Sequence, residues 1–270
     1  MTTRHAIAPE DFVHTGFEMT GHVLTITLNR PERRNALNWR AYAELESAFL
    51  AAHDDPQVRC VIVTGADSAF CSGDDVSEIM AAPGGGIAKR GASIVHNPPT
   101  PAAIAALECA KPVIAAVNGA AIGWGFELAL FADLRIASDR AKFSEMFVKR
   151  GLTCDVGGFY RLPALVGPEK AAELLFTGDV IDAAEALRIG LVGRVAAHAD
   201  LMRDARALAE RIAANPPLAV RAIVEARRAS LEELEVKAYA IRPRTLHLSE
   251  DFRESALAYV EKRAPVFKGR

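Results

Sequence analysis

The chain has 270 residues and a formal net charge of -2, and 50% of its residues are apolar against 24% charged. This composition is typical of a globular protein and excludes a disordered or fibrous chain. Acids and bases are mixed along the chain, so no basic field draws it to nucleic acid or to a membrane, and any anionic ligand must be held locally. The length predicts one main domain, residues 1–199, with a helical appendage, residues 200–270.

The chain contains four cysteines, at Cys60, Cys71, Cys109 and Cys154. They form no CxxC pair and have no metal-like spacing, and the histidines form no triad or metal pattern. The N-terminal residues lack the basic start and apolar run of a signal peptide, and no apolar run is long enough to span a membrane. We therefore expect a cytoplasmic protein with reduced thiols and no metal.

The first half of the chain alternates between strand and helix patterns. Residues 22–28 alternate like a half-buried strand, and a helix is predicted over residues 39–52 with Asn38 as its cap. Residues 60–64 form a continuous β-branched run, which is typical of a strand covered on both faces. The alternation recurs at residues 112–117, 125–133 and 134–137. It predicts an α/β core.

Two later regions have different patterns. Residues 80–108 contain three consecutive glycines and several prolines, which predicts a mobile loop and pocket wall instead of a rigid element. Helices are predicted after residue 200, including one from residue 216 and one over residues 231–241. The last helix should begin after Ser249, include Lys262 and Arg263 in its final turn and end at Pro265. Its predicted apolar stripe is Phe252, Ala256, Tyr259 and Val260.

Residues 69–76 are the first candidate for chemistry. They form a strand exit at which Gly73 lets the backbone bend sharply, so that amide hydrogens can point into a cavity. The alternative is a plain glycine turn in which Asp74 and Asp75 cap the next helix. Cys71 has no nearby histidine to activate it, and we interpret it as a buried structural thiol.

Residues 117–127 are the second candidate, because an apolar strand passes through glycines into an apolar helix. A helix N-terminus offers amide hydrogens and positive potential, which a developing oxyanion needs. The spacing of Gly119, Gly123 and Gly125 does not fit a dinucleotide-binding fingerprint. Glu127 has only apolar neighbours, so desolvation would raise its pKa toward the range useful for proton transfer. The alternative is an acid in the first helical turn that the helix dipole favours.

Several motifs together resemble the crotonase (enoyl-CoA hydratase/isomerase) family, and the resemblance runs from about residue 22 to residue 270. They are Asn29-Arg-Pro with Asn-Ala-Leu at 35–37, Phe-Cys-Ser-Gly-Asp-Asp at 70–75, Ala-Val-Asn-Gly at 116–119 with Gly-Trp-Gly-Phe-Glu at 123–127, and Gly-Leu-Thr-Cys-Asp-Val-Gly-Gly at 151–158. Residues 162–167 and the tail at 261–269 fit the family as well.

The resemblance implies a spiral of ββα units with a helical C-terminal region used to form a homotrimer or a dimer of trimers. It also implies an oxyanion hole made by the backbone amides of Asp74 and Trp124, which grip the carbonyl of an acyl-CoA thioester. These donors are amides, so their side chains can vary, and a Trp where many relatives carry Gly should shape the pocket.

The same resemblance implies where coenzyme A binds as part of the substrate, with no separate cofactor. The nucleotide would lie near four residues of one subunit, Arg33, Ala36, Ser72 and Val76. A neighbouring subunit would contribute Tyr259 and Lys262, and a lysine suits a phosphate contact.

The chain departs from the family pattern at one catalytic position. Hydratases of the family carry two glutamates that position a water. Glu127 matches the first, but Phe147 occupies the second, and a phenyl ring cannot transfer a proton. Asp155 matches an aspartate that carries the chemistry in relatives that isomerise double bonds or displace halide, although the local pattern alone favours a helix cap.

We therefore expect an enzyme that stabilises a thioester enolate, with Glu127 and Asp155 as catalytic residues. The departure predicts weak simple hydratase activity and favours isomerisation or a specialised substrate. The alternatives are an acyl-CoA hydrolase, dehalogenase or decarboxylase of the same fold, or a catalytically impaired CoA-binding or RNA-binding relative. The absence of a basic stripe counts against RNA.

Overall fold

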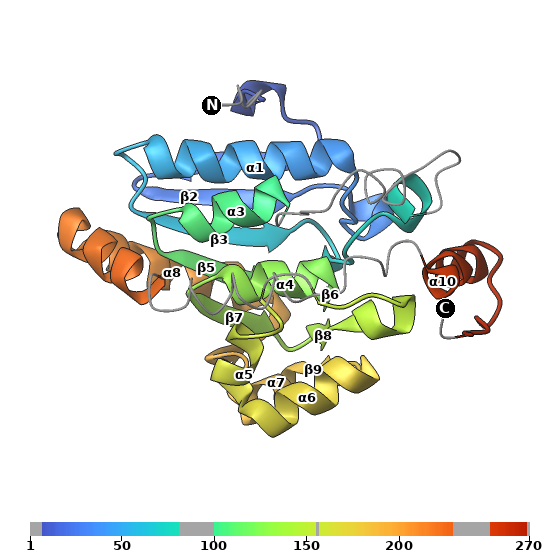
Figure 1. The fold of residues 1–270 in the computed structure, drawn as a ribbon. Helices are drawn as coiled ribbons and strands as arrows, with labels where there is room; N and C mark the ends of the chain where they lie inside the picture. The colour runs from blue at the N-terminus through green and yellow to red at the C-terminus, as the bar shows by residue number, and fades with distance from the viewer. Residues whose placement is uncertain (1–6, 81–99, 155–156, 229–248, 269–270) are drawn as a thin grey trace.

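The computed structural model describes residues 7–80, 100–154, 157–228 and 249–268, and its arrangement is drawn in Figure 1. The strands are β1 (Thr15–Thr20), β2 (Val23–Leu28), β3 (Cys60–Gly65), β4 (Ala69–Cys71), β5 (Val113–Val117), β6 (Ala120–Ile122), β7 (Leu134–Ser138), β8 (Lys142–Ser144), β9 (Ile181–Asp182) and β10 (Arg194–Ala196). The α-helices are α1 (Trp39–Asp54), α3 (Pro101–Glu108), α4 (Trp124–Phe131), α5 (Arg161–Val166), α6 (Pro168–Thr177), α7 (Ala183–Arg188), α8 (Leu201–Ala213) and α10 (Glu250–Val260). Short helical turns are η1 (Pro9–Asp11), η2 (Pro31–Arg33), η3 (Val76–Met80), η4 (Met146–Arg150) and η5 (His198–Asp200), and residues 217–228 are also helical.

The strands form two sheets that share a repeated connection. The larger sheet has the order β1-β2-β3-β5-β7-β10, and the smaller has the order β4-β6-β8-β9. Each of β3, β5 and β7 in the larger sheet is followed directly by a strand of the smaller one, and the neighbours β4, β6 and β8 pair in parallel. This repetition is the predicted spiral of ββα units, and it brings the ends of successive units together along one edge.

Helices cover both faces of the larger sheet. One apolar cluster joins it to α1, α3 and α4, and a second joins its other face to α8 through Leu201, Ala205, Ala209 and Ala213. All residues of β3 and β5 are buried, because helices lie on both sides of these central strands. The predicted strands at residues 22–28, 60–64, 112–117 and 134–137 are confirmed within a residue or two. The domain boundary at residue 200 stays a prediction, although α8 packs on the sheet.

The helix caps follow the sequence. The Asn38 side chain accepts a hydrogen bond of 2.9 Å from the Ala41 amide at the start of α1, and the Ser249 hydroxyl accepts one of 3.0 Å from the Phe252 amide at the start of α10. A short polar side chain at these positions satisfies an amide that has no partner inside the helix.

Two sequence predictions are wrong. Residues 101–108, predicted as part of a mobile loop, form helix α3, because Thr100 caps the helix and Pro101 stands at its first position before an alanine-rich run. The last helix ends at Val260 and not at Pro265, and Lys262 follows with φ of 55°. Within the helix, Phe252 and Ala256 are buried, while Tyr259 and Val260 are about half exposed. The predictions for residues 81–99 and 231–241 lie outside the described residues.

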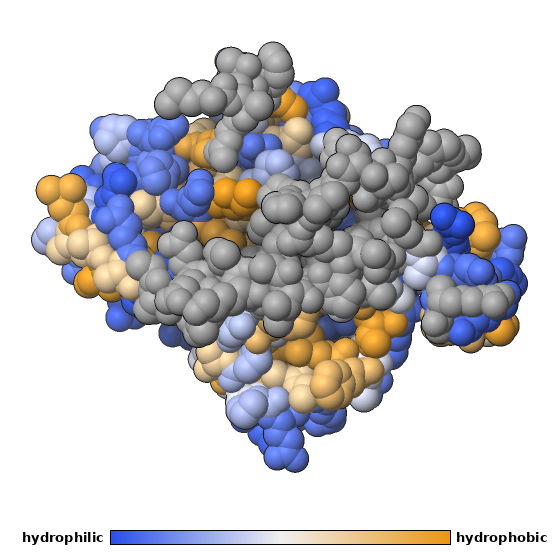
Figure 2. Space-filling model, viewed as in Figure 1, coloured by the Kyte–Doolittle hydropathy of each residue, from blue (hydrophilic) through white to orange (hydrophobic). Residues whose placement is uncertain are grey.

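The visible surface mixes hydrophilic and hydrophobic residues. Figure 2 shows hydrophobic residues gathered over the lower part of the molecule, around α6, where Phe176 is 78% exposed. No helix in the described parts of the chain has the length and apolar character needed to cross a membrane.

Candidate active site

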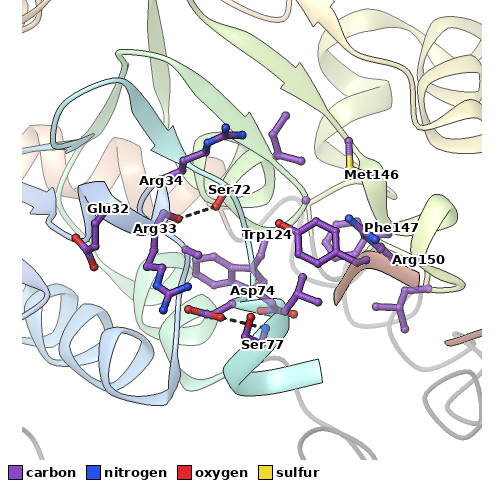
Figure 3. A pocket seen from close by; sticks show the side chains of 18 residues that line it. Glu32, Arg33, Arg34, Ser72, Asp74, Ser77, Trp124, Met146, Phe147 and Arg150 are labelled. Atoms are coloured by element: carbon purple, nitrogen blue, oxygen red, sulfur yellow. Dashed lines mark hydrogen bonds between the residues drawn. The ribbon is translucent and has the colours of Figure 1, made fainter. Parts of the chain in front are cut away.

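A pocket of about 520 Å³ opens where the ends of β4 and β6 meet η2, η4 and α10. This is the size of a site for a small organic ligand. Figure 3 shows Glu32, Arg33 and Arg34 on one side, Met146, Phe147 and Arg150 on the other, and Trp124 and Asp74 between them. The pocket therefore brings together the two segments that the sequence singles out, residues 69–76 and 117–127.

The backbone around Asp74 is fixed by the segment that precedes α1. The Leu37 amide donates to the Gly73 carbonyl at 2.8 Å, and the Leu37 carbonyl accepts from the Asp75 amide at 2.9 Å. In extended backbone, successive peptide groups point to opposite sides. The Asp74 N–H is therefore directed away from Leu37, toward the side where β4 pairs with β6.

The turn between β6 and α4 approaches this backbone closely. Gly73 has φ of 84°, and a β-carbon added there would lie 2.9 Å from the Ile122 carbonyl oxygen and 3.4 Å from the Trp124 nitrogen. A β-carbon at Gly125 would lie 2.1 Å from the Cys71 carbonyl oxygen. Only glycine fits at both positions, because a side chain at either would push the two segments apart.

The amide of Trp124 is the first of helix α4. The next amides that bond within the turn are those of Phe126 and Glu127, and both donate to the Gly123 carbonyl. The first amides of a helix have no partner inside it and carry the positive end of its dipole. Asp74 and Trp124 both line the pocket, and the start of α4 makes positive potential available there to a ligand oxygen.

The loop after β2 braces the exit of β4. Arg30 is buried, and its guanidinium donates to the Asp75 carboxylate at 3.0 Å and to the Ala36 carbonyl at 2.7 Å. Asp75 also accepts from the amides of Ser77 and Glu78, so the predicted helix-cap role is confirmed for Asp75. The carboxylate of Asp74 instead accepts a hydrogen bond of 2.5 Å from the hydroxyl of Tyr42.

Glu127 is fully buried in the first turn of α4. Its carboxylate accepts hydrogen bonds from the amides of Gly157 and Gly158, the second at 3.1 Å. Glu127 does not line the pocket. Asp155 lies outside the described residues, but Gly157 is only two residues further along the chain, so Glu127 holds the segment that immediately follows Asp155.

Five of the six residues assigned to coenzyme A line the pocket, namely Arg33, Ala36, Ser72, Val76 and Tyr259. Tyr259 does so within its own chain, whereas the resemblance assigned it to a neighbouring subunit. Lys262 is not among the lining residues.

Arg150 was not singled out from the sequence. Its guanidinium lies over the Tyr259 ring, 4.6 Å from the centroid, and it lines the pocket. Burial lowers the pKa of Arg150, although a guanidinium stays charged in a protein. The only available signal was a basic residue shortly after a strand, which is too common to be informative.

The residues of β4, the strand that leads into the pocket, are all buried. Cys71 is fully buried, and burial raises the pKa of its thiol to about 12. This confirms that Cys71 is a buried thiol. Within residues 7–80, 100–154, 157–228 and 249–268, no three His, Cys, Asp or Glu side chains are grouped in a way that could hold a metal ion.

Comparison with known proteins gives a consistent result. The family model described as enoyl-CoA hydratase/isomerase matches residues 18–270. The chain is 40% identical over 261 residues to the carnitinyl-CoA dehydratase of Proteus mirabilis strain HI4320, covering 93% of this chain and 96% of the relative. It is 41% identical over 267 residues to the carnitinyl-CoA dehydratase of Escherichia coli strain K12, with the same coverage.

Solved structures agree with the sequence relatives. An enoyl-CoA hydratase/isomerase from Pseudoalteromonas atlantica T6c superposes with a TM-score of 0.82 at 32% identity, over 95% of this chain and 100% of that one. The chain therefore belongs to the enoyl-CoA hydratase/isomerase family, and it is a crotonase-fold enzyme of the enoyl-CoA hydratase type.

Proposed function

We propose that the enzyme catalyses the reversible removal of water from a 3-hydroxyacyl-CoA to give a 2-enoyl-CoA. The observation that carries this proposal is the close approach of the Gly73 backbone to the turn before Trp124, with Asp74 and Trp124 both lining one pocket. Two amides aimed at a thioester carbonyl oxygen stabilise the negative charge that develops there when the α-carbon loses its proton. The relatives named carnitinyl-CoA dehydratase support a hydration–dehydration reaction.

The steps follow from this arrangement. The thioester carbonyl oxygen accepts hydrogen bonds from the two amides, which acidifies the α-carbon. A carboxylate takes the α-proton, the enolate forms, and the β-hydroxyl leaves as water when it receives a proton. One oxyanion-hole donor is typically worth about 3–4 kcal/mol of barrier, and acid–base assistance adds roughly 10²- to 10⁴-fold.

We assign the proton transfers to Glu127 and Asp155. For Glu127 the support is its match to the family motif and its place three residues after Trp124, since the residue itself is buried beside the pocket and does not line it. The support for Asp155 is its match to the family motif, together with the contact of Glu127 to the two glycines that follow it. No metal or separate cofactor enters the proposed reaction, and coenzyme A is part of the substrate.

The charged mouth of the pocket supports coenzyme A as the carrier. Arg33, Arg34 and Arg150 line it, and each can contact a phosphate. The tyrosine ring of Tyr259, already stacked with Arg150, offers a flat apolar surface beside these charges. A chain of net charge -2 can thus hold a strongly anionic ligand locally.

Double-bond isomerisation is the second candidate. Phe147 lines the pocket where a hydratase has its second glutamate, so one of the two groups that position a water is missing. Isomerisation needs only the removal of one proton and its return at another carbon. It uses the same oxyanion site.

One assay separates these reactions. The purified protein is incubated with 3-hydroxybutanoyl-CoA, crotonyl-CoA and 3-butenoyl-CoA, and the products are followed by mass and by enoyl absorbance. Loss or gain of one water supports dehydration or hydration, and new enoyl absorbance at unchanged mass supports isomerisation. Release of free coenzyme A indicates a hydrolase. Absence of every change across a wider acyl panel contradicts an enzyme of this type.

A homotrimer or a dimer of trimers is part of the same proposal. Helix α10 and the tail after it expose several large apolar side chains, namely Leu257, Tyr259, Val260, Val266 and Phe267. Exposed apolar groups of this kind are common where subunits meet. Light scattering after gel filtration should give three or six chain masses, and a monomer at working concentration would contradict the proposal.

A further inference from the structure

One side chain of helix α1 contacts both residues of the proposed oxyanion site. The hydroxyl of Tyr42 donates a hydrogen bond of 2.5 Å to the Asp74 carboxylate. The ring of Tyr42 also meets the Trp124 ring edge to face, with centroids 4.9 Å apart and planes at 87°. Tyr42 is only 9% exposed, so both contacts are made inside the protein.

The carboxylate of Asp74 poses an electrostatic problem for the proposed reaction. An oxyanion that binds the Asp74 amide forms close to the negative charge on the side chain of the same residue. Repulsion between the carboxylate and the nearby oxyanion raises the energy of the developing enolate, and this repulsion is stronger where water is excluded. A phenol hydrogen bond draws the carboxylate toward α1 and spreads its charge.

The contact between Tyr42 and Trp124 helps to hold the Trp124 ring in place. Trp124 is 3% exposed, and its ring makes a second edge contact with the ring of Phe131, with centroids 5.9 Å apart and planes at 79°. Aromatic pairs in this geometry contribute roughly 0.5–1.5 kcal/mol beyond the area they bury. Trp124 is therefore held between Tyr42 and Phe131, and its backbone amide is the first of α4.

The backbone also links the helix that carries Tyr42 to Asp74. The residue that bridges the Asp74 backbone is Leu37, and α1 begins two residues later at Trp39. The segment that fixes the Asp74 backbone thus continues directly into the helix that carries Tyr42. Tyr42 adds a side-chain hydrogen bond to the Asp74 carboxylate.

We propose that Tyr42 is a positioning residue for the oxyanion site, which holds the Asp74 carboxylate away from the developing charge and fixes Trp124 at the start of α4. The inference rests on the function proposed above. An oxyanion hole uses only the backbone amides of Asp74 and Trp124, so small side chains would suffice at both positions. Because one side chain here is charged and the other is bulky, another residue has to hold them in place.

Tyr42→Phe tests the hydroxyl while keeping the ring. We expect kcat to fall roughly 10- to 30-fold while KM changes less than about threefold, because the lost interaction acts mainly in the transition state. Urea unfolding of the variant checks that it is folded. An unchanged kcat in a folded variant would overturn the proposal, and so would a rise in KM alone.

A spectroscopic readout reports the oxyanion site directly. Bound crotonyl-CoA, with and without ¹³C at the carbonyl, gives an isotope-edited infrared band for the thioester carbonyl. In the wild-type protein this band should shift to lower frequency on binding, and in Tyr42→Phe the shift should be smaller. A wild-type shift that Tyr42→Phe retains in full overturns the role of Tyr42 alone. A wild-type protein that binds the thioester without any shift overturns the oxyanion site itself and Tyr42 with it.

Asp74→Asn separates the control of charge from simple packing. An asparagine keeps an oxygen that can accept from Tyr42 but carries no charge. The loss of kcat caused by Tyr42→Phe should therefore be several-fold smaller in the Asp74→Asn background. Equal losses in both backgrounds would contradict the electrostatic part of the proposal.

Discussion

The two ends of the pocket are lined by different kinds of chemical group. At the inner end, where the oxyanion site is proposed, the backbone is held by buried contacts, among them the Leu37 bridge and the close approach of Gly125 to Cys71. At the mouth, long charged side chains such as Arg33 and Arg150 line the opening. In the proposed reaction the inner end would stabilise charge in the transition state, whereas the mouth would contribute binding that is uniform along the reaction.

Glu127→Gln should give the largest effect at the inner end. An amide offers one acceptor in place of two, so its NH₂ group would face one of the glycine N–H groups that the carboxylate now binds. We expect kcat to fall by about 10²-fold or more, with a small change in KM. Steady-state kinetics with the substrate found in the panel checks this.

Glu18→Gln is the matched control, because Glu18 is exposed on β1, far along the chain from the pocket segments. It should leave kcat unchanged. Asp155→Asn should lower kcat to a similar extent as Glu127→Gln. Wild-type rates from either Glu127→Gln or Asp155→Asn would remove that residue from the mechanism.

Gly73→Ala should disturb the inner end by moving backbone. The new β-carbon meets the Ile122 carbonyl oxygen at 2.9 Å, and φ is 84°. We expect kcat to fall about 10-fold or more, because small displacements of a site cost rate steeply.

Gly21→Ala is its control, since φ is also positive, at 59°, but nothing lies within 4 Å of the added carbon. It should lower the free energy of unfolding by about 1–2 kcal/mol from backbone strain and leave kcat unchanged. Urea unfolding and kinetics on both variants are the measurements. Equal rates for Gly73→Ala and Gly21→Ala would mean that the approach of the two segments is unimportant for turnover.

Arg150→Ala should affect the mouth and spare the inner end. The variant removes a cation and the contact with Tyr259. We expect KM for the CoA thioester to rise roughly 5- to 10-fold, which corresponds to about 1 kcal/mol, with kcat within twofold. The rise should be smaller at high salt, because salt screens exposed charges.

Arg140→Ala, an exposed arginine in the turn between β7 and β8, is the control and should not change KM. A drop in kcat without a change in KM for Arg150→Ala would reverse the assignment of the mouth to binding.

Stability at high pH should show the smallest effect, and it reports how well two thiols in the core are shielded from water. Burial raises the pKa of Cys71 and of Cys60 to about 12, from 9.0. Between these values the unfolded chain loses protons that the folded protein keeps, so the free energy of unfolding falls as pH rises above about 9. The slope is up to about 1.4 kcal/mol per pH unit for each thiol. Urea unfolding at pH 8 and pH 10 should show a smaller decrease in Cys71→Ala than in the wild type, and an equal decrease would show that Cys71 is hydrated.

Local patterns in the sequence determined much of the fold. The β-branched run at residues 60–64 and the caps Asn38 and Ser249 depend on neighbours along the chain, and the structure has β3 and the starts of α1 and α10 where they predict them. The motifs at residues 70–75 and 123–127 likewise located the pocket, because glycines beside apolar strands leave backbone accessible. Helix α3 was missed because the proline and glycine content before it obscured the cap at Thr100.

Contacts between distant segments could be decided only by the tertiary structure. Tyr42 occupies an ordinary helical position, and its contact with Asp74, 32 residues later, exists because the exit of β4 pairs with the segment before α1. The partners of the Glu127 carboxylate, Gly157 and Gly158, are about 30 residues away and were equally invisible. Local propensity fixes which segments are strands, helices and turns, whereas a site depends on which of their ends meet, and that follows from packing the whole chain.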